Sequence, residues 1–238
     1  MKKAGKFYGV GVGPGDPELL TIKAVRILGG VDVVCTPKSR GDKESIALSI
    51  ARRVLKRGCK VIEPLFPMVK NPEILERHWD EAVEMIYKEL REGRDVAFIT
   101  LGDPLFYSTY APLLRRLRER YPEVEIETVP GITSFLACMA HVNTPLVEGD
   151  EKLTVLPATY SPNEMGKIIG THESAVLMKV PKEINGLIEE LEALGLADKA
   201  IFLSRCGSRE FFSSPLKAMR GEKIDYLSMV VVKRRGFQ

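Results

Sequence analysis

The sequence predicts two α/β lobes, each built on a mostly parallel sheet. Apolar runs rich in β-branched residues alternate along the chain with amphipathic stretches, which is the pattern of consecutive strand–helix units. A length of 238 residues is enough for two such lobes with a core each. We expect a first lobe over residues 1–120, a second over residues 121–238, and a ligand cleft between them.

The predicted strands of the first half are short and apolar. They lie at residues 6–12, 31–37, 59–65, 95–101 and 124–130. Asp16 before Pro17 is an N-cap signal that predicts a helix after the first strand. Asn71 before Pro72 predicts a second helix, which Gly93 ends.

The second half continues the alternation. Its predicted strands lie at residues 152–158, 174–180, 199–205 and 226–234, with helical stretches such as 182–195 between them. The charged stretch 115–125 is where we expect the two lobes to meet. An exposed helix face followed by a turn at Pro122 explains its charges equally well.

Composition excludes several classes of protein. Hydrophobic residues make up 45% of the chain, charged residues 28%, and the formal net charge is only +3, so nothing indicates nucleic acid as a partner. No apolar run approaches the roughly 20 residues that cross a bilayer. Cys35, Cys59, Cys138 and Cys206 form no CxxC pair, so we expect neither a zinc ribbon nor a disulfide framework, and we expect a cytoplasmic protein.

The glycine-rich opening "GVGVGPGDP" is not a dinucleotide-binding fingerprint. The pattern G-x-G-x-x-G fails in every register, because its third glycine falls on Pro14, Asp16 or Glu18. The Asp16 carboxylate also has the wrong sign to face a phosphate. A tight strand-to-helix turn without a ligand explains these residues too.

Other familiar catalytic motifs are missing from the sequence. It contains neither a phosphate-binding G-x-x-x-x-G-K-[ST] loop nor a G-x-S-x-G motif. His78, His141 and His172 are far apart in sequence, so we interpret them as surface or packing residues rather than metal ligands or triad members. We expect no metal on the protein.

Three loops follow predicted strands at the carboxyl edge of the first sheet, where open parallel sheets bind ligands. The second of them contains Gly102, which permits close approach of the main chain, and Asp103 beside it. The third contains Thr133 and Ser134 at the start of a helix. A turn with a helix cap explains each loop alone, but three of them on one edge favour a site.

Together, "GVGPGDPELLTIKAVRIL", "TLGDPLFYST", "VPGITSF" and "RCG" resemble the tetrapyrrole methyltransferases, which transfer methyl groups from S-adenosylmethionine to corrin and sirohaem precursors. In detail the chain is most similar to the carbon-20 methyltransferases of cobalamin synthesis, which act on precorrin-2 or cobalt-factor II. Uroporphyrinogen methyltransferases usually have "GRG" soon after the GDP motif. This chain has Tyr107, Ser108 and Thr109 there instead.

The resemblance implies a role for each motif. The methyl donor, S-adenosylmethionine, with S-adenosylhomocysteine as its product, would be surrounded by Leu101, Gly102, Asp103, Ser108, Thr109, Thr133, Ser134, Ala158 and Met178. The tetrapyrrole would face Pro14, Gly15, Asp16, Lys38, Arg40 and Arg205. Asp103 would organise the donor and Tyr107 would contact the substrate, as the candidate catalytic residues. The family also implies a homodimer.

Several alternatives stay open at this point. The cations could be ordinary surface charges, and Ala158 and Met178 could be turn and core residues. The acceptor could be metal-free precorrin-2 or cobalt-factor II, and uroporphyrinogen III or another corrin intermediate is the alternative within the same enzyme class. A catalytically silent nucleotide-binding module is the alternative from a different class.

Overall fold

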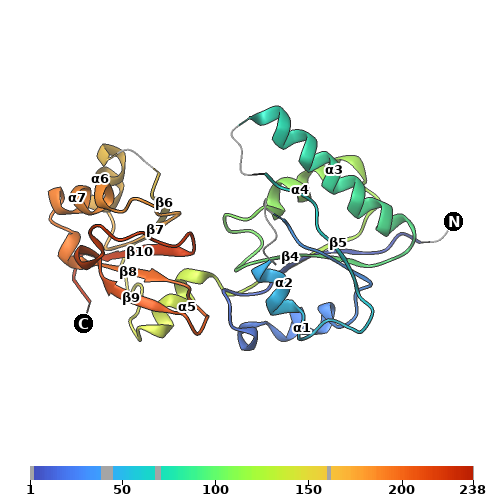
Figure 1. Ribbon diagram of the computed structural model, residues 1–238, viewed down its shortest axis with the longest axis horizontal. Helices are drawn as coiled ribbons and strands as arrows, with labels where there is room; N and C mark the ends of the chain where they lie inside the picture. Colours follow the sequence, from blue (N-terminus) through green and yellow to red (C-terminus); the bar gives the residue numbers. More distant parts are fainter. Residues whose placement is uncertain (1–2, 39–44, 68–70, 160–161, 238) are drawn as a thin grey trace. The chain divides into compact units, whose positions relative to one another are not determined.

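The computed structural model describes residues 3–38, 45–67, 71–159 and 162–237 (Figure 1). The chain divides into two compact units, Met1–Thr133 and Ser134–Gln238. The division therefore lies beyond the expected boundary at residues 120 and 121. Strand β5 (Ile126–Val129) explains this shift, because it pairs with β1 (Phe7–Gly11) in the first sheet.

The first unit contains a five-stranded parallel sheet in the order β3-β2-β4-β1-β5. Its other strands are β2 (Val33–Cys35), β3 (Lys60–Ile62) and β4 (Val96–Thr100). All five strands lie inside the ranges predicted for them. Strands β2 and β4 are buried throughout, which explains why apolar runs marked them, since strands covered on both faces are near-continuous hydrophobic runs.

Helices cover both faces of this sheet. On one face, α3 (Pro72–Arg91) and α4 (Tyr110–Arg120) pack on the strands, and on the other face α1 (Ile22–Leu28) and α2 (Ile46–Ala51) do so (Figure 1). The Tyr110 ring fills the space above Gly9, where any side chain on the glycine would overlap it. The unit is thus three layers around two apolar cores.

The capping predictions have different outcomes. Asn71 accepts a hydrogen bond from the Glu73 amide at 2.9 Å, which confirms the predicted start of α3. Asp16 caps only the short 3-10 helix η1 (Pro17–Leu19). The chain is extended at Leu20, and α1 starts afresh with Thr21 as its own cap.

The second unit contains a mixed five-stranded sheet in the order β6-β7-β10-β8-β9. Its strands are β6 (Leu153–Pro157), β7 (Ser174–Met178), β8 (Ala200–Ser204), β9 (Phe212–Pro215) and β10 (Ser228–Lys233). Only β6 and β7 pair in parallel, so the expectation of a mostly parallel sheet is wrong for this unit. Strand β10 is inserted antiparallel between β7 and β8, which leaves β6, β7 and β8 pointing the same way.

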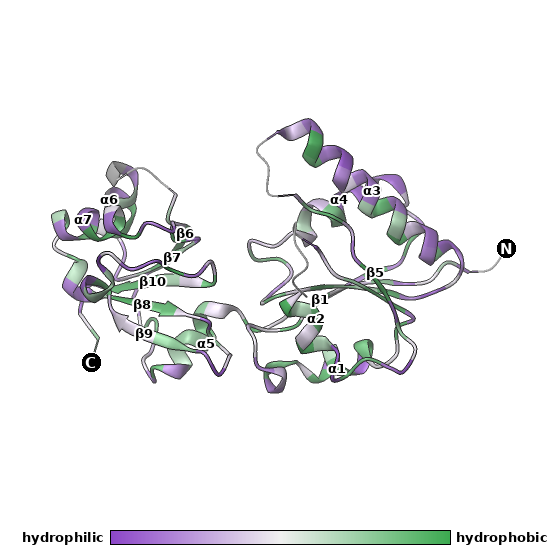
Figure 2. Ribbon diagram, in the orientation of Figure 1, coloured by the Kyte–Doolittle hydropathy of each residue, from purple (hydrophilic) through white to green (hydrophobic). Residues whose placement is uncertain are grey.

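The described part of the second unit contains the α-helices α5 (Ser134–His141), α6 (Pro162–Gly170) and α7 (Asn185–Ala193). Two short 3-10 helices, η2 (Ala197–Lys199) and η3 (Leu216–Met219), flank β8 and β9. Hydrophobic residues gather on the strands between the helices (Figure 2), and α6 and α7 pack on one face of the sheet. Within the described ranges, no helix is long and apolar enough to cross a membrane.

One pair of cysteines departs from the sequence analysis. Cys138 on α5 and Cys206 after β8 lie side by side in disulfide contact, with their Cα atoms 5.0 Å apart. The two residues are 68 positions apart in sequence, so no local spacing pattern could have indicated the pair. Cys35 and Cys59 are free thiols.

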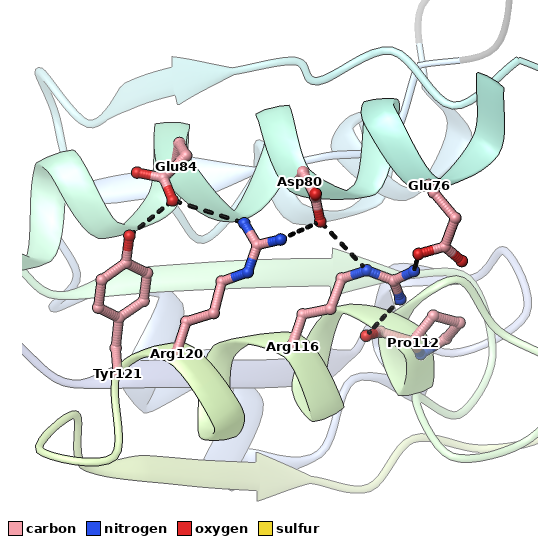
Figure 3. A network of polar contacts seen from close by, with 7 residues as sticks. All are labelled: Glu76, Asp80, Glu84, Pro112, Arg116, Arg120 and Tyr121. Atoms are coloured by element: carbon pink, nitrogen blue, oxygen red, sulfur yellow. Dashed lines mark hydrogen bonds and ion pairs between the residues drawn. The ribbon is translucent and has the colours of Figure 1, made fainter. Parts of the chain in front are cut away.

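Helices α3 and α4 are joined by a ladder of charges (Figure 3). Glu76, Asp80 and Glu84 lie four residues apart on α3, so they share one face of the helix. Arg120 is 2.6 Å from the Asp80 carboxylate, and Arg116 pairs with Glu76 and Asp80. The Glu84 carboxylate accepts a hydrogen bond from the Tyr121 hydroxyl, which raises the pKa of Tyr121 to about 12.

Replacing Arg116 by Met should lower the free energy of unfolding by about 1 kcal/mol, because its side chain is only 13% exposed and holds several partners at once. Arg115→Met, on the exposed side of the same helix, is the matched control and should stay within about 0.5 kcal/mol of the parent. Urea unfolding measures both variants. Equal losses would show that the ladder adds nothing to packing of the helix.

Candidate functional site

Three loops meet at the carboxyl edge of the first sheet. Because β1 lies between β4 and β5, the segments that follow these strands, residues 12–16, 101–109 and 130–133, are neighbours. The sequence predicts the same three loops at one edge, and the sheet order brings them together. Lys38 follows β2, the next strand beyond β4.

The main chains of these loops touch at glycines. A Cβ atom on Gly11 would lie 2.6 Å from the Gly102 carbonyl oxygen, and one on Gly131 would overlap the same oxygen. Gly102 itself has a positive φ of 71°, a conformation that favours glycine. Its amide donates to the Gly13 carbonyl at 2.8 Å, which ties the second loop to the first.

Asp103 ties the second loop to the third. Its Oδ2 accepts a hydrogen bond from the Gly131 amide at 3.0 Å, and its Oδ1 accepts one from the Leu105 amide at 2.8 Å. Charge-assisted bonds of this kind are stronger than neutral ones. Since both carboxylate oxygens already hold backbone amides, we interpret Asp103 as a positioning residue rather than as a proton acceptor.

The hydroxyl groups predicted around the site differ in their contacts. Ser108 Oγ donates to the Pro104 carbonyl at 2.7 Å and accepts from the Tyr110 amide at 2.9 Å, so it shapes the turn into α4. Thr109 occupies the N-cap position of α4 without a side-chain cap bond. Thr133 Oγ1 is buried and has no hydrogen-bond partner within the described part of the chain. A buried hydroxyl without a partner is costly, which makes Thr133 a candidate ligand contact.

Tyr107 is the exposed aromatic residue of the second loop. It has a positive φ of 48°, is 48% exposed, and its ring lies edge-on to Phe106 at a centroid distance of 4.8 Å. A left-handed conformation is uncommon for a bulky residue and is found most often where the surrounding structure enforces it at a functional site. Leu101, in contrast, packs partly against the core under α1 and α2.

The residues of the first unit predicted to face a tetrapyrrole follow β1 and β2 in the chain. Pro14 is buried, Gly15 is partly exposed, and the Asp16 carboxylate is used by the Glu18 amide. Lys38 is 39% exposed, with its Nζ 3.9 Å from Glu63. Arg40 lies outside the described residues.

The second unit holds the remaining predicted residues at the carboxyl ends of β6, β7 and β8. The Ala158 amide donates to the Met178 carbonyl at 2.6 Å, so these two residues are neighbours. Arg205 has a φ of 52°, and its guanidinium binds Asp225 at 2.5 Å and also pairs with Glu210. The hydrogen bond to Asp225 raises the pKa of Arg205, and the cation is already neutralised inside the unit. Ser134 begins α5 of the same unit.

The histidines contact other groups of their own unit. His78 Nδ1 lies 3.3 Å from Glu81, His172 Nδ1 lies 2.8 Å from the Ile168 carbonyl, and His141 accepts from the Gly207 amide. Among the residues that the structure describes, no three His, Cys, Asp or Glu side chains form a group that could hold a metal ion.

Sequence reasoning missed two partners at this edge. It singled out Asp103 but not the Gly131 amide that Asp103 binds, and it did not foresee the contact between the Gly11 and Gly131 main chains. The "PG" after the fifth strand and the alternate glycines of the first strand were the available signals. Which two loops would touch depends on the strand order, which those signals do not contain.

The chain is similar to known proteins over most of its length. Residues 6–219 match the sequence model of the family described as Tetrapyrrole (Corrin/Porphyrin) Methylases. The probable cobalt-precorrin-2 C(20)-methyltransferase of Methanocaldococcus jannaschii is 38% identical over 96% of both chains. The precorrin-2 C(20)-methyltransferase of a Sinorhizobium species is 33% identical over 96% of this chain and 95% of its own.

Solved structures show the same fold. A cobalt precorrin-4 methyltransferase, CbiF, superposes with a TM-score of 0.75 at 22% identity, covering 96% of this chain and 94% of its own. A uroporphyrin-III C-methyltransferase from Thermus thermophilus, complexed with S-adenosylhomocysteine, has a TM-score of 0.67 at 22% identity and covers 96% of this chain and 97% of its own.

Asp103→Asn should destabilise the first unit by about 1–3 kcal/mol. The Asn side chain has only one oxygen, so its NH₂ group would face the backbone N–H of either Gly131 or Leu105, and that N–H would lose its acceptor. Hydrogen exchange at the Gly131 and Leu105 amides should become faster, and urea unfolding gives the change in stability. Asp16→Asn is the control, since Asn is as good an N-cap as Asp. Unchanged exchange at Gly131 in Asp103→Asn would contradict the positioning role.

Proposed function

This chain belongs to the family of tetrapyrrole (corrin/porphyrin) methylases, and we propose that it methylates carbon-20 of cobalt-factor II or precorrin-2 in cobalamin biosynthesis. The observation that carries the proposal is the similarity, over nearly the whole length, to two relatives whose names both specify carbon-20. Tyr107, Ser108 and Thr109 in place of "GRG" support a corrin precursor over uroporphyrinogen.

S-adenosylmethionine is the donor that we propose for the first-sheet edge. The residues there fit such a group, because Thr133 Oγ1 is a buried hydroxyl without a protein partner and Gly102 lets the main chain approach closely. The S-adenosylhomocysteine bound by the Thermus thermophilus relative supports the same donor. When bound, the donor supplies an electrophilic methyl group on a sulfonium, which leaves as a neutral thioether.

The chain's contribution to this reaction is alignment. A methyl transfer between two bound molecules requires the attacking carbon, the methyl and the sulfur to lie in line, and correct placement alone supplies a large part of such a rate. The bonds from Asp103 to Gly131 and Leu105, with the Gly102 to Gly13 bond, fix three loops relative to one another before any ligand arrives. Tyr107 is exposed beside them and is the residue that we propose contacts the tetrapyrrole.

The proposed binding of the tetrapyrrole depends on positively charged side chains. A tetrapyrrole rim with many carboxylates requires cations, and Lys38 is the best candidate among the described residues because its ammonium is exposed and only loosely paired with Glu63. Arg205 is a weaker candidate than the sequence suggested, since Asp225 and Glu210 already bind it. We also propose, from the family resemblance, that the enzyme works as a homodimer.

Thr133→Val tests the donor site. Removing the hydroxyl should weaken S-adenosylhomocysteine binding roughly 3- to 10-fold in calorimetry, while the ligand-free protein should be no less stable, because the lost group has no protein partner. Thr171→Val is the control, since Thr171 lies between α6 and the amino end of β7, away from the carboxyl ends where the predicted residues lie, and its hydroxyl donates to the Ile168 carbonyl of α6. Equal affinity in Thr133→Val and the parent would remove Thr133 from the donor site.

Parallel incubation with methyl donor and each candidate acceptor tests the function itself. Mass spectrometry and absorbance should show one methyl group gained by cobalt-factor II, precorrin-2 or both, and none by uroporphyrinogen III. Methylation of uroporphyrinogen III alone would refute the proposal. Absence of S-adenosylhomocysteine binding at millimolar ligand would instead favour a catalytically silent module.

A further inference from the structure

We propose that Cys138 and Cys206 are joined as a disulfide in the native protein and that, with His141, they hold the loop 205–211 against α5. We call these contacts the α5 latch. The loop connects β8 to β9, and Arg205 is its first residue. All of these residues lie within the second unit.

The latch has three contacts from one helix face. Cys138 and His141 are three residues apart on α5, so their side chains lie on the same side of the helix. Cys138 meets Cys206 with a Cα separation of 5.0 Å, inside the range of ordinary disulfides. His141 Nε2 accepts a hydrogen bond from the Gly207 amide at 3.1 Å, and its ring stacks on Phe211 at a centroid distance of 4.4 Å.

Burial of both cysteines protects the disulfide from reduction. Cys138 is 0% exposed and Cys206 is 4% exposed, so the closed pair is shielded from reductants in solution. The bond therefore forms while the loop is still open. One cysteine thiolate attacks a low-molecular-weight disulfide and displaces its first thiol. The second cysteine thiolate then attacks the mixed disulfide and displaces the other thiol, so the two cysteines lose two electrons and two protons to the small disulfide.

The latch acts on a loop whose backbone includes a residue in an uncommon conformation. The backbone at Arg205 is held in a left-handed conformation with a φ of 52°, and Gly207 has a φ of 77°. Glycine adopts such a φ freely, but the left-handed conformation at Arg205 persists only where surrounding contacts hold it. Any contact of Arg205 with a tetrapyrrole rests on the proposed function and would first require Arg205 to leave Asp225 or Glu210, whereas the disulfide does not rest on that function.

Alkylation of the denatured protein, purified without reductant, tests the disulfide. Two cysteines per chain should react, Cys35 and Cys59, and four should react after reduction. A peptide map should link the segments around residues 138 and 206. Four reactive cysteines before reduction would overturn the proposal. None of these readouts needs substrate or methyl donor, so they are independent of the proposed function.

Stability tests the latch as a whole. Protein refolded with a phosphine reductant should melt roughly 5–15 °C lower than protein refolded without it, and amides of residues 205–211 should exchange faster. The double variant Cys138→Ala with Cys206→Ala should melt at the lower temperature under both conditions. Cys59→Ser, in the first unit, should keep the full response to reductant. If the disulfide forms but changes neither the melting temperature nor the amide hydrogen exchange of residues 205–211, the proposal that it holds this loop against α5 is refuted.

Discussion

The first unit depends on a contact between main chains that leaves no room for side chains. Gly11 and Gly131 approach the Gly102 carbonyl so closely that a single methyl group on either glycine would overlap it. Only residues without a Cβ allow the ends of β1, β4 and β5 to converge in this way. The convergence brings the Gly131 amide within reach of Asp103, and it places Thr133 where its hydroxyl is buried. The candidate donor site therefore follows from backbone packing more than from any one side chain.

Some charged side chains are paired within the protein, and others are available to bind a ligand. On α3 and α4, acidic and basic side chains satisfy one another along the ladder, and in the second unit Arg205 is similarly engaged by Asp225 and Glu210. Such groups are unsuited to bind a further anion without first losing a partner. Lys38 differs because its ammonium is 3.9 Å from Glu63, so an anionic ligand could displace that weak pairing at low cost.

Local patterns predicted local structure well. Apolar runs located nine of the ten strands that the described residues form, and Asn71 with Pro72 marked the start of α3. They also predicted that three loops share one sheet edge, because parallel strands end on the same side. Strand β9 was missed because it is short, contains no apolar run and is mostly exposed. The insertion of β10 between β7 and β8 depends on packing across the whole unit. Local patterns could not predict the Cys138–Cys206 pair or the hydrogen bond between Asp103 and Gly131 either, because each joins segments that are distant in sequence.

The place of β10 in the second sheet bears on how the chain folds as it is synthesised. The first sheet has all of its strands once residue 129 has emerged from the ribosome. The second sheet has a gap between β7 and β8 until residues 228–233 arrive. During translation the first unit can therefore fold early. Strands β7 and β8 each keep one unpaired edge until β10 is made, and a strand of another chain could pair with that edge. The vulnerable period for aggregation is thus the interval between synthesis of β8 and synthesis of β10.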